Sequence, residues 1–166
     1  MANVVLTLGD DISTDHIYPG RYMATVLPAE TPQYAFADYP LNKNLNSGQI
    51  PPQSIIVAGE NFGCGSSREQ AVSALKGWEL VIIATSFGRI FFQNAVNLGL
   101  KLVICPTLEA DEGDELEVTE AEVINHSKGK RFPIVPLPAA RKAIIEAGGL
   151  IAYTRQRLVA ERKISG

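Results

Sequence analysis

One stretch of the chain, residues 59–70, combines glycines with side chains that can bind an anion or carry a proton. Its first seven residues contain three glycines, which permit positive φ angles and close backbone approach. Ser66, Ser67 and Arg68 come next, directly before a segment with a helical pattern. The unpaired N–H groups and the dipole at a helix start attract anions, and an arginine adds a planar cation that matches a carboxylate. The stretch therefore predicts a site for a small carboxylate or phosphate.

A structural interpretation of the two serines stays open beside the chemical one. Ser66-x-x-Glu69 and Ser67-x-x-Gln70 both have the spacing of a capping box. A serine that caps a helix contributes about 1 kcal/mol to stability without doing any chemistry. Known glycine loops do not decide the question, because the Walker, dinucleotide-binding and hydrolase-elbow patterns each fail at one or more positions here.

A second polar stretch, residues 9–21, also gathers ionisable side chains. They are Asp10, Asp11, Asp15, His16 and Arg21. We interpret Asp10 and Asp11 as a solvated turn, and residues 13–15 as capping or turn chemistry. Asp15 and His16 precede the apolar pair Ile17-Tyr18, so they enter an apolar environment. A carboxylate and an imidazole could form a metal pair, but two side chains are too few for a site.

Composition limits the class of protein. The chain has 166 residues, 46% of them hydrophobic, which suits a single domain over residues 1–166. The net charge of −3 and the lack of a basic run argue against nucleic-acid binding. No apolar segment approaches the roughly 20 residues of a membrane span, and the N-terminus lacks the pattern of a signal peptide. Cys64 and Cys105 support neither a disulfide framework nor a metal or cluster site, so we expect a cytoplasmic protein without a bound metal.

The elements that must position these residues follow an alternating pattern. Apolar runs predict strands at residues 4–8, 55–58, 80–84 and 101–105, with helices at 71–76 and 86–97. Three strands that alternate with two helices predict parallel pairing with right-handed crossovers. The fold class is therefore α/β, with a mixed, mostly parallel sheet and flanking helices.

The remaining segments are less regular. Residues 22–52 contain five prolines and only a short predicted helix at 33–37, so we interpret them as an irregular flap near the site. Tyr34, Phe36 and Tyr39 argue against a disordered linker there. Beyond the parallel part, the pattern predicts a small β-meander at residues 115–135 and a helix at 139–147. A further helical turn or two at 150–158 and a polar, frayed tail at 159–166 complete the expectation.

Four motifs, in this order along the chain, resemble those of a known protein family. They are Gly9-Asp-Asp-Ile-Ser-Thr-Asp-His-Ile-x-Pro-Gly-Arg21, Gly59-Glu-Asn-Phe-Gly-Cys-Gly-Ser-Ser-Arg-Glu69, Ser86-Phe-Gly-Arg-Ile-Phe91 and Asn94-Ala-Val-Asn-Leu-Gly99. Together they resemble the aconitase superfamily, and within it the family of separate small subunits of 3-isopropylmalate dehydratases, over about residues 4–150. The order and spacing of all four make the resemblance specific.

The resemblance implies a swivelling β/β/α domain that works with a large subunit carrying a [4Fe-4S] cluster, as a heterodimer or heterotetramer. It implies a hydro-lyase that moves a hydroxyl between adjacent carbons of a small dicarboxylic hydroxy acid, in leucine biosynthesis. The cluster iron of the partner would act as a Lewis acid on the departing hydroxyl. Since Cys64 and Cys105 do not form a three-cysteine set, the chain alone is expected to be folded, colourless and inactive.

The resemblance also assigns roles to individual residues. Ser66 corresponds to the base that removes the carbon-bound proton, Arg68 to the residue that binds a substrate carboxylate, and Asp15 to a carboxylate facing the site. We expect the remaining substrate-binding residues to be Gly65, Ser67, His16, Arg21, Tyr22, Met23, Ala24 and Thr25. A helix N-terminus and a neighbouring guanidinium give a physical reason for the base, because both stabilise a serine alkoxide.

Substrate and function classes stay partly open at this point. Met23 and Ala24 offer apolar surface that suits an isopropyl group, where homoaconitase-type relatives tend to place an arginine at the position of Ala24. Dimethylmalate, citraconate or maleate remain alternative substrates. A non-catalytic anion-binding or assembly module is the alternative of another class. A stand-alone serine hydrolase is disfavoured, because neither His16 nor His126 lies in a triad context.

Overall fold

A computed structural model describes residues 1–165 of the chain, with side chains as far as Arg162. Seven strands of this part form one sheet in the order β4-β3-β2-β1-β5-β6-β7. The strands are β1 (Ala2–Thr7), β2 (Ile55–Ala58), β3 (Val81–Ala84), β4 (Lys101–Ile104), β5 (Glu115–Val118), β6 (Glu122–Asn125) and β7 (Lys130–Pro133). The helices are α1 (Thr14–Ile17), α2 (Pro40–Asn46), α3 (Glu69–Gly77), α4 (Arg89–Leu98), α5 (Ala139–Glu146) and α6 (Leu150–Ser165), with 3-10 turns η1 (Gly20–Tyr22) and η2 (Thr31–Tyr34).

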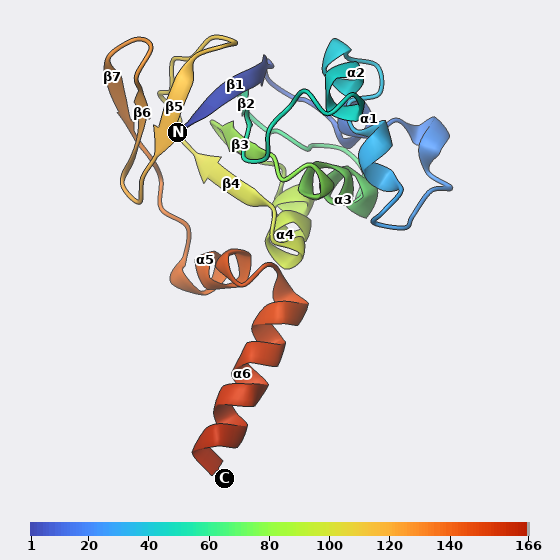
Figure 1. Cartoon of the computed structure of the whole chain (residues 1–166), viewed down its shortest axis with the longest axis vertical. Coiled ribbons are helices and arrows are strands. Elements are labelled where there is room, and N and C mark those ends of the chain that lie inside the picture. The colour runs from blue at the N-terminus through green and yellow to red at the C-terminus, as the bar shows by residue number, and fades with distance from the viewer. Residues whose placement is uncertain (166) are drawn as a thin grey trace.

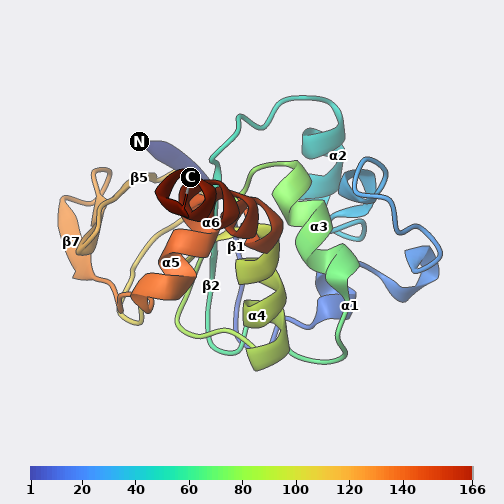
Figure 2. The same cartoon turned by 90° about the horizontal axis from the view of Figure 1, so that it is seen from below.

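The sheet has a parallel half and an antiparallel half. Strands β1 to β4 pair in parallel, and β5 joins the far edge of β1 in antiparallel orientation before β6 and β7 continue it. Figures 1 and 2 show the antiparallel strands on one side of the parallel ones and helices α3 and α4 on the other. This three-layer arrangement confirms the predicted β/β/α fold with a mixed sheet.

Alternation along the parallel strands divides the interior into two cores. Successive side chains of a strand point to opposite faces, so Ile56 and Ile82 pack with α3 and α4, whereas Ile55 and Val81 face the antiparallel strands. Both faces are apolar, as parallel strands covered on both sides require. This burial explains why the strands could be recognised as short continuous apolar runs.

The segment predicted as an irregular flap is ordered over much of its length, so that prediction was wrong for residues 31–46. They contain η2 and α2, and bury Phe36, Leu41 and Leu45 in the core. Two polar contacts fasten η2 to α3 and its end: the indole N–H of Trp78 donates to the Pro32 carbonyl at 2.6 Å, and the Thr31 and Ser73 hydroxyls lie 2.8 Å apart. The residues on either side, 23–30 and 47–52, contain no helix or strand and are mostly exposed, as predicted.

The C-terminal tail also differs from the prediction. Helix α6 runs without interruption to Ser165 and projects away from the rest of the molecule in Figure 1. Arginine, glutamine, leucine, alanine and glutamate dominate residues 155–162, and all of them favour helix, so a polar composition did not imply a frayed end. Gly166, which belonged to the predicted tail, lies outside the described residues. None of the helices described is both long enough and apolar enough to cross a bilayer.

Candidate functional site

Two loops that follow adjacent parallel strands build the candidate site. One follows β1 and the other follows β2, and the carboxyl ends of neighbouring parallel strands bring such loops together. The backbone N–H of Asp11 donates to the Glu60 carbonyl at 2.8 Å, that of Gly63 to the Ile12 carbonyl at 2.7 Å, and that of Thr14 to the Cys64 carbonyl at 2.8 Å. Residues 9–16 and 59–66 therefore run side by side.

Asp10 and Asp11 hold these two loops together. An Asp10 carboxylate oxygen accepts from the Glu60 N–H at 2.7 Å, and an Asp11 carboxylate oxygen accepts from the Asn61 side chain at 3.1 Å. A Cβ atom at Gly59 would lie 2.0 Å from that Asp10 oxygen, so only glycine fits there. Both aspartates are exposed, as a solvated turn requires, but the sequence did not reveal that they join the loops.

Ser66 lies exposed on the turn between β2 and α3. Gly65 precedes it with φ of 98°, a conformation that favours glycine. Among the residues that the structure describes, no protein group accepts a hydrogen bond from the N–H groups of residues 65–68 or from the Ser66 hydroxyl. The turn therefore presents several free donors around one free hydroxyl, which is a suitable arrangement for an anion.

Neither serine caps helix α3, so the capping-box interpretation of Ser66 and Ser67 is wrong. The helix begins at Glu69, its N-cap is Arg68 in an extended conformation, and no side chain caps it. The positive φ of Gly65 and the extended backbone of Arg68 displace the helix start beyond the serines. The capping box of this region lies instead in α1, between Ser13 and His16.

Arg68 and Asp15 form an ion pair that brings the two loops' charged residues together. The Arg68 Nη1 donates to Asp15 Oδ1 at 2.6 Å and to the Tyr18 carbonyl at 3.0 Å. The Arg68 side chain is 17% exposed and that of Asp15 is 63% exposed. The Arg68 guanidinium, and then the Gly20 N–H that also donates to this carboxylate, lower the pKa of Asp15 below its usual range. Arg68 is therefore held in one place while its second guanidinium nitrogen, Nη2, has no hydrogen-bond partner among the described residues.

His16 and Ser67 lie at the edge of this group. The Nδ1 of His16 accepts from the Ser13 N–H at 3.0 Å, which leaves the proton of a neutral ring on Nε2. The Asn94 side chain of α4 donates to the Ser67 hydroxyl at 3.4 Å. The sequence did not single out Thr14 or Asn94 for this site, because a lone threonine or asparagine carries no recognisable pattern.

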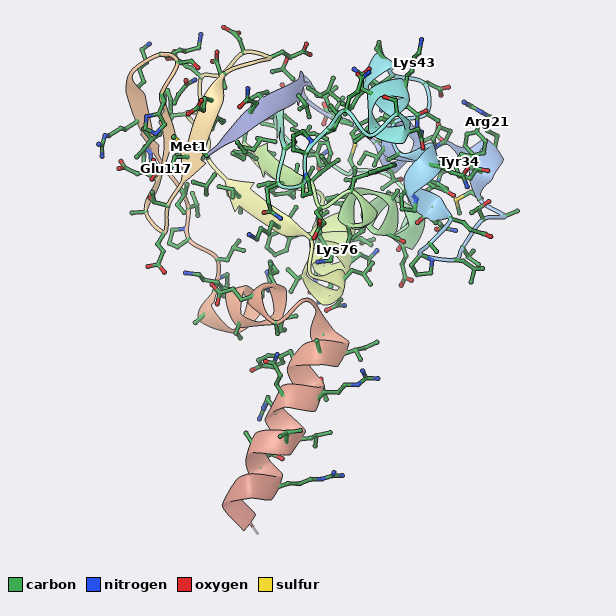
Figure 3. All side chains as sticks on the ribbon, in the orientation of Figure 1. Met1, Arg21, Tyr34, Lys43, Lys76 and Glu117 are labelled. Atoms are coloured by element: carbon green, nitrogen blue, oxygen red, sulfur yellow. The ribbon has the colours of Figure 1, made fainter. Side chains whose placement is uncertain are left out.

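Residues 21–25 lie beside the site, but two of their side chains are engaged elsewhere. The guanidinium of Arg21 forms a two-pronged ion pair with Asp38, and the Tyr22 ring stacks on Tyr34 at a centroid distance of 4.1 Å. Arg21 and Tyr34 are labelled in Figure 3 at the same side of the molecule. Whether Arg21 and Tyr22 contact a substrate remains a prediction.

The loop itself approaches the start of α3. The Gln70 side chain donates to the Met23 carbonyl at 3.3 Å, and the Tyr18 hydroxyl donates to the Thr25 carbonyl at 3.3 Å. The side chains of Met23 and Ala24 are exposed. The backbone of the loop therefore lies close to the start of α3, and the loop carries two exposed apolar side chains.

The residues of this chain do not fit an iron–sulfur cluster. Cys64 is half-buried on the turn before Ser66, whereas Cys105 is buried in the core facing the antiparallel strands. Among the described residues, no three histidine, cysteine or acidic side chains are arranged to hold a metal ion. A cavity of about 900 Å³ extends along β4 and the amino ends of the other parallel strands, and no residue of the two site loops lines it.

Comparisons with known proteins point to one family. The model of the aconitase C-terminal domain matches residues 17–105. The 3-isopropylmalate dehydratase small subunit of Methanosarcina mazei is 45% identical, with 93% of this chain and 95% of that protein covered. The proteins of the same name from Thermodesulfovibrio yellowstonii and Lachnospira eligens are 42% and 46% identical, each with at least 92% of both chains covered.

A solved structure agrees with the sequence relatives. The crystal structure of the 3-isopropylmalate dehydratase LeuD of Methanocaldococcus jannaschii superimposes with a TM-score of 0.87 at 38% identity. The match covers 97% of this chain and 96% of that one. The similarity therefore extends over the whole fold rather than over the glycine-rich turn alone.

Proposed function

This chain belongs to the 3-isopropylmalate dehydratase small-subunit family of aconitase C-terminal domains, and we propose that it supplies one half of the active site of such a hydro-lyase. The other half comes from a large subunit. The complex interconverts 2-isopropylmalate and 3-isopropylmalate by dehydration and rehydration, as a step of leucine biosynthesis in the cytoplasm.

The observation that carries this proposal is that the Ser66 hydroxyl is exposed and has no hydrogen-bond partner among the described residues. If Ser66 only stabilised α3, its side-chain oxygen would accept a hydrogen bond from a helix N–H, and it does not. The backbone N–H groups of residues 65–68 have no acceptor among the described residues, and Arg68 lies two residues further on. Positive groups of this kind lower the energy of an alkoxide, which is the form of serine that can remove a proton.

The roles of the residues follow from the reaction. Ser66, as alkoxide, takes the proton from one carbon of the substrate while hydroxide leaves the adjacent carbon, and a double bond forms between them. Hydroxide then adds to the first carbon, and the Ser66 hydroxyl returns its proton to the second. A serine base in this setting contributes about 10²–10⁴-fold to the rate.

Arg68 acts on a carboxylate of the substrate rather than on the proton, and Asp15 supports Arg68. The Nη2 of Arg68, which has no partner among the described residues, is the donor that we assign to a substrate carboxylate. Asp15 holds the guanidinium so that little conformational freedom is lost on binding. The N–H groups of Gly65 and Ser67 are further donors to the same anion.

The substrate class follows from the loop beside the site. Met23 and Ala24 are exposed and apolar, and we propose that they contact the isopropyl group. One methylene in an apolar pocket changes discrimination by only about 1–3 kcal/mol, so related diacids with smaller substituents are expected as weaker substrates. The [4Fe-4S] cluster that the family implies does not fit this chain, and we place it in the large subunit.

Reconstitution tests the proposal. The purified chain is mixed with a purified large subunit under anaerobic conditions, and the interconversion of the two isopropylmalates is followed. We expect turnover from the mixture and none from either protein alone. A panel with dimethylmalate, citraconate, maleate and homoaconitate ranks the substrates. If the two proteins co-purify and no diacid of the panel turns over, the chain is a binding module and the proposal is wrong.

A further inference from the structure

Thr14 is a buried polar residue that directly contacts the backbone of the proposed base. It is only 3% exposed, although it carries a hydroxyl. That hydroxyl donates to the Ser66 carbonyl oxygen at 2.9 Å, and the Thr14 N–H donates to the Cys64 carbonyl at 2.8 Å. Two hydrogen bonds from one residue therefore hold both ends of the short segment from Cys64 to Ser66.

The hydrogen bond to the Ser66 carbonyl determines where the next N–H group points. In a trans peptide the carbonyl oxygen and the following N–H point in opposite directions. Because the Ser66 carbonyl points toward Thr14, the Ser67 N–H points away from it, and no protein acceptor among the described residues receives it. The same bond limits rotation of the backbone that carries the Ser66 side chain.

The two residues at the start of α1 act on neighbouring groups of the site. Thr14 binds the carbonyl of Ser66, and Asp15 binds the guanidinium of Arg68. Ser13, just before them, forms the capping box that fixes the helix start. Consecutive residues of one short helix therefore hold the proposed base and the proposed carboxylate-binding arginine in a fixed relative position.

We infer that Thr14 is a positioning residue: its hydroxyl fixes the Ser66–Ser67 peptide, so that the Ser66 side chain and the Ser67 N–H are oriented for the reaction. The inference rests on the function proposed above. Its test therefore includes a measurement on the isolated chain that does not depend on turnover.

Three variants separate positioning from general stability. T14V removes the hydroxyl and keeps the shape of the side chain, whereas T14S keeps the hydroxyl. T31V is the matched control, since Thr31 is also buried and its hydroxyl also makes a hydrogen bond, to Ser73, but away from the site. Thermal unfolding of each variant reports the stability lost.

For the reconstituted complex we expect T14V to lower kcat about tenfold, which corresponds to the loss of one hydrogen bond, with KM changed less than twofold. T14S should restore most of kcat, and T31V should leave it unchanged. In the isolated chain, ¹⁵N relaxation should give a lower order parameter for the Ser67 amide in T14V than in the native chain, T14S or T31V.

The outcomes are distinguishable. If T14V keeps the native kcat and the native order parameter of Ser67, the inference is overturned. If no variant, including the native chain, turns over substrate, the proposed function fails, and the relaxation data alone decide whether Thr14 fixes the peptide. Should T14V not fold, T14A removes the same hydroxyl with less risk of a steric clash and is subjected to both measurements.

Discussion

Among single residues, Asp15 holds the Arg68 guanidinium in place, and its charge can be switched by pH. Its pKa is lowered by Arg68 first and by the Gly20 N–H second, so the folded state favours the carboxylate. Because the pKa is lowered, the charged carboxylate stabilises the folded state at pH values above its ordinary pKa of 3.8. That stability is lost as the pH falls through the lowered pKa.

Substituting D15N should therefore lower the free energy of unfolding at pH 6, and the difference from the native chain should shrink below pH 3.8. Urea unfolding at several pH values measures this difference. A difference that stays constant from pH 6 to the acid end of the series would show that the charge of Asp15 does not contribute through Arg68.

The two cysteines should differ in reactivity. Cys105 is 2% exposed, and burial raises the pKa of its thiol, whereas Cys64 is half-buried on the turn before Ser66. The thiolate is the reactive form, so a small alkylating reagent should modify Cys64 first. Peptide mass spectrometry after short exposure measures the two rates, with C64A as the control in which only the slow reaction remains. Equal rates in the native chain would contradict the burial of Cys105.

How far single residues could be identified from sequence depended on local pattern. Ser66 and Arg68 stood out because glycines and a helix start lie beside them in the chain. Thr14 did not, because its partner Ser66 is 52 positions away and the contact is to a backbone carbonyl, which leaves no trace in residue types. Asn94 was missed as well, because its partner, the Ser67 hydroxyl, is 27 positions away and lies on another element.

At the scale of elements, the turn between β2 and α3 depends on Gly63. This residue has φ of 84°, and a Cβ atom there would lie 2.2 Å from the Phe91 ring of α4. Substituting G63A should therefore lower the free energy of unfolding by about 2–4 kcal/mol, from backbone strain and overlap together.

Gly113 offers the matched control for this substitution. Its φ is 90°, but a Cβ atom there meets nothing within 4 Å, so G113A carries the backbone strain alone. We expect G113A to cost about 1–2 kcal/mol. Urea unfolding of both variants measures the difference, and equal losses would show that the packing of the turn on α4 is not tight.

The sequence predicted strands with a continuous apolar run well. It predicted the start of one helix wrongly and missed another helix. Strands β2, β3 and β4 match the predicted positions within one residue. Helix α4 begins at Arg89 instead of Ser86, because the backbone of residues 86–88 is hydrogen-bonded to Phe62. Helix α2 was missed, since its proline, asparagines and lysine resemble a loop and only Leu41 and Leu45 are buried.

At the scale of the whole molecule, α6 packs against the rest of the protein at its base and exposes its described side chains further along. The Gly149 backbone packs against the end of α4, where a Cβ atom would lie 2.7 Å from the Asn97 carbonyl. Further along, Leu158 and Val159 are each 51% exposed. A close glycine contact therefore lies at the base of α6, which composition alone could not reveal.

Deleting residues 156–166 should leave the free energy of unfolding of the isolated chain within about 0.5 kcal/mol of the native value, because its described side chains, those of residues 156–162, are exposed. Thermal unfolding of the truncated and full chains measures this. A large loss of stability would show that the outer part of α6 packs against the body of the protein in solution.

The arrangement of the sheet was only partly predictable, because some of its paired strands are far apart in the sequence. Alternating strands and helices predicted the parallel half, because each crossover is local in sequence. The pairing of β5 with the far edge of β1 joins residues more than 100 positions apart, and short alternating strands do not specify such a partner. The antiparallel half was therefore expected as a meander whose place in the sheet was unknown.

The central claim is that the Ser66 hydroxyl removes the carbon-bound proton in a site completed by a large subunit. The most direct measurement is kcat of S66A in the reconstituted complex, beside S47A, which removes an exposed hydroxyl from the end of α2. The account predicts a loss of about 10²–10⁴-fold for S66A, with complex formation preserved, and none for S47A. Native turnover by an intact S66A complex would contradict it.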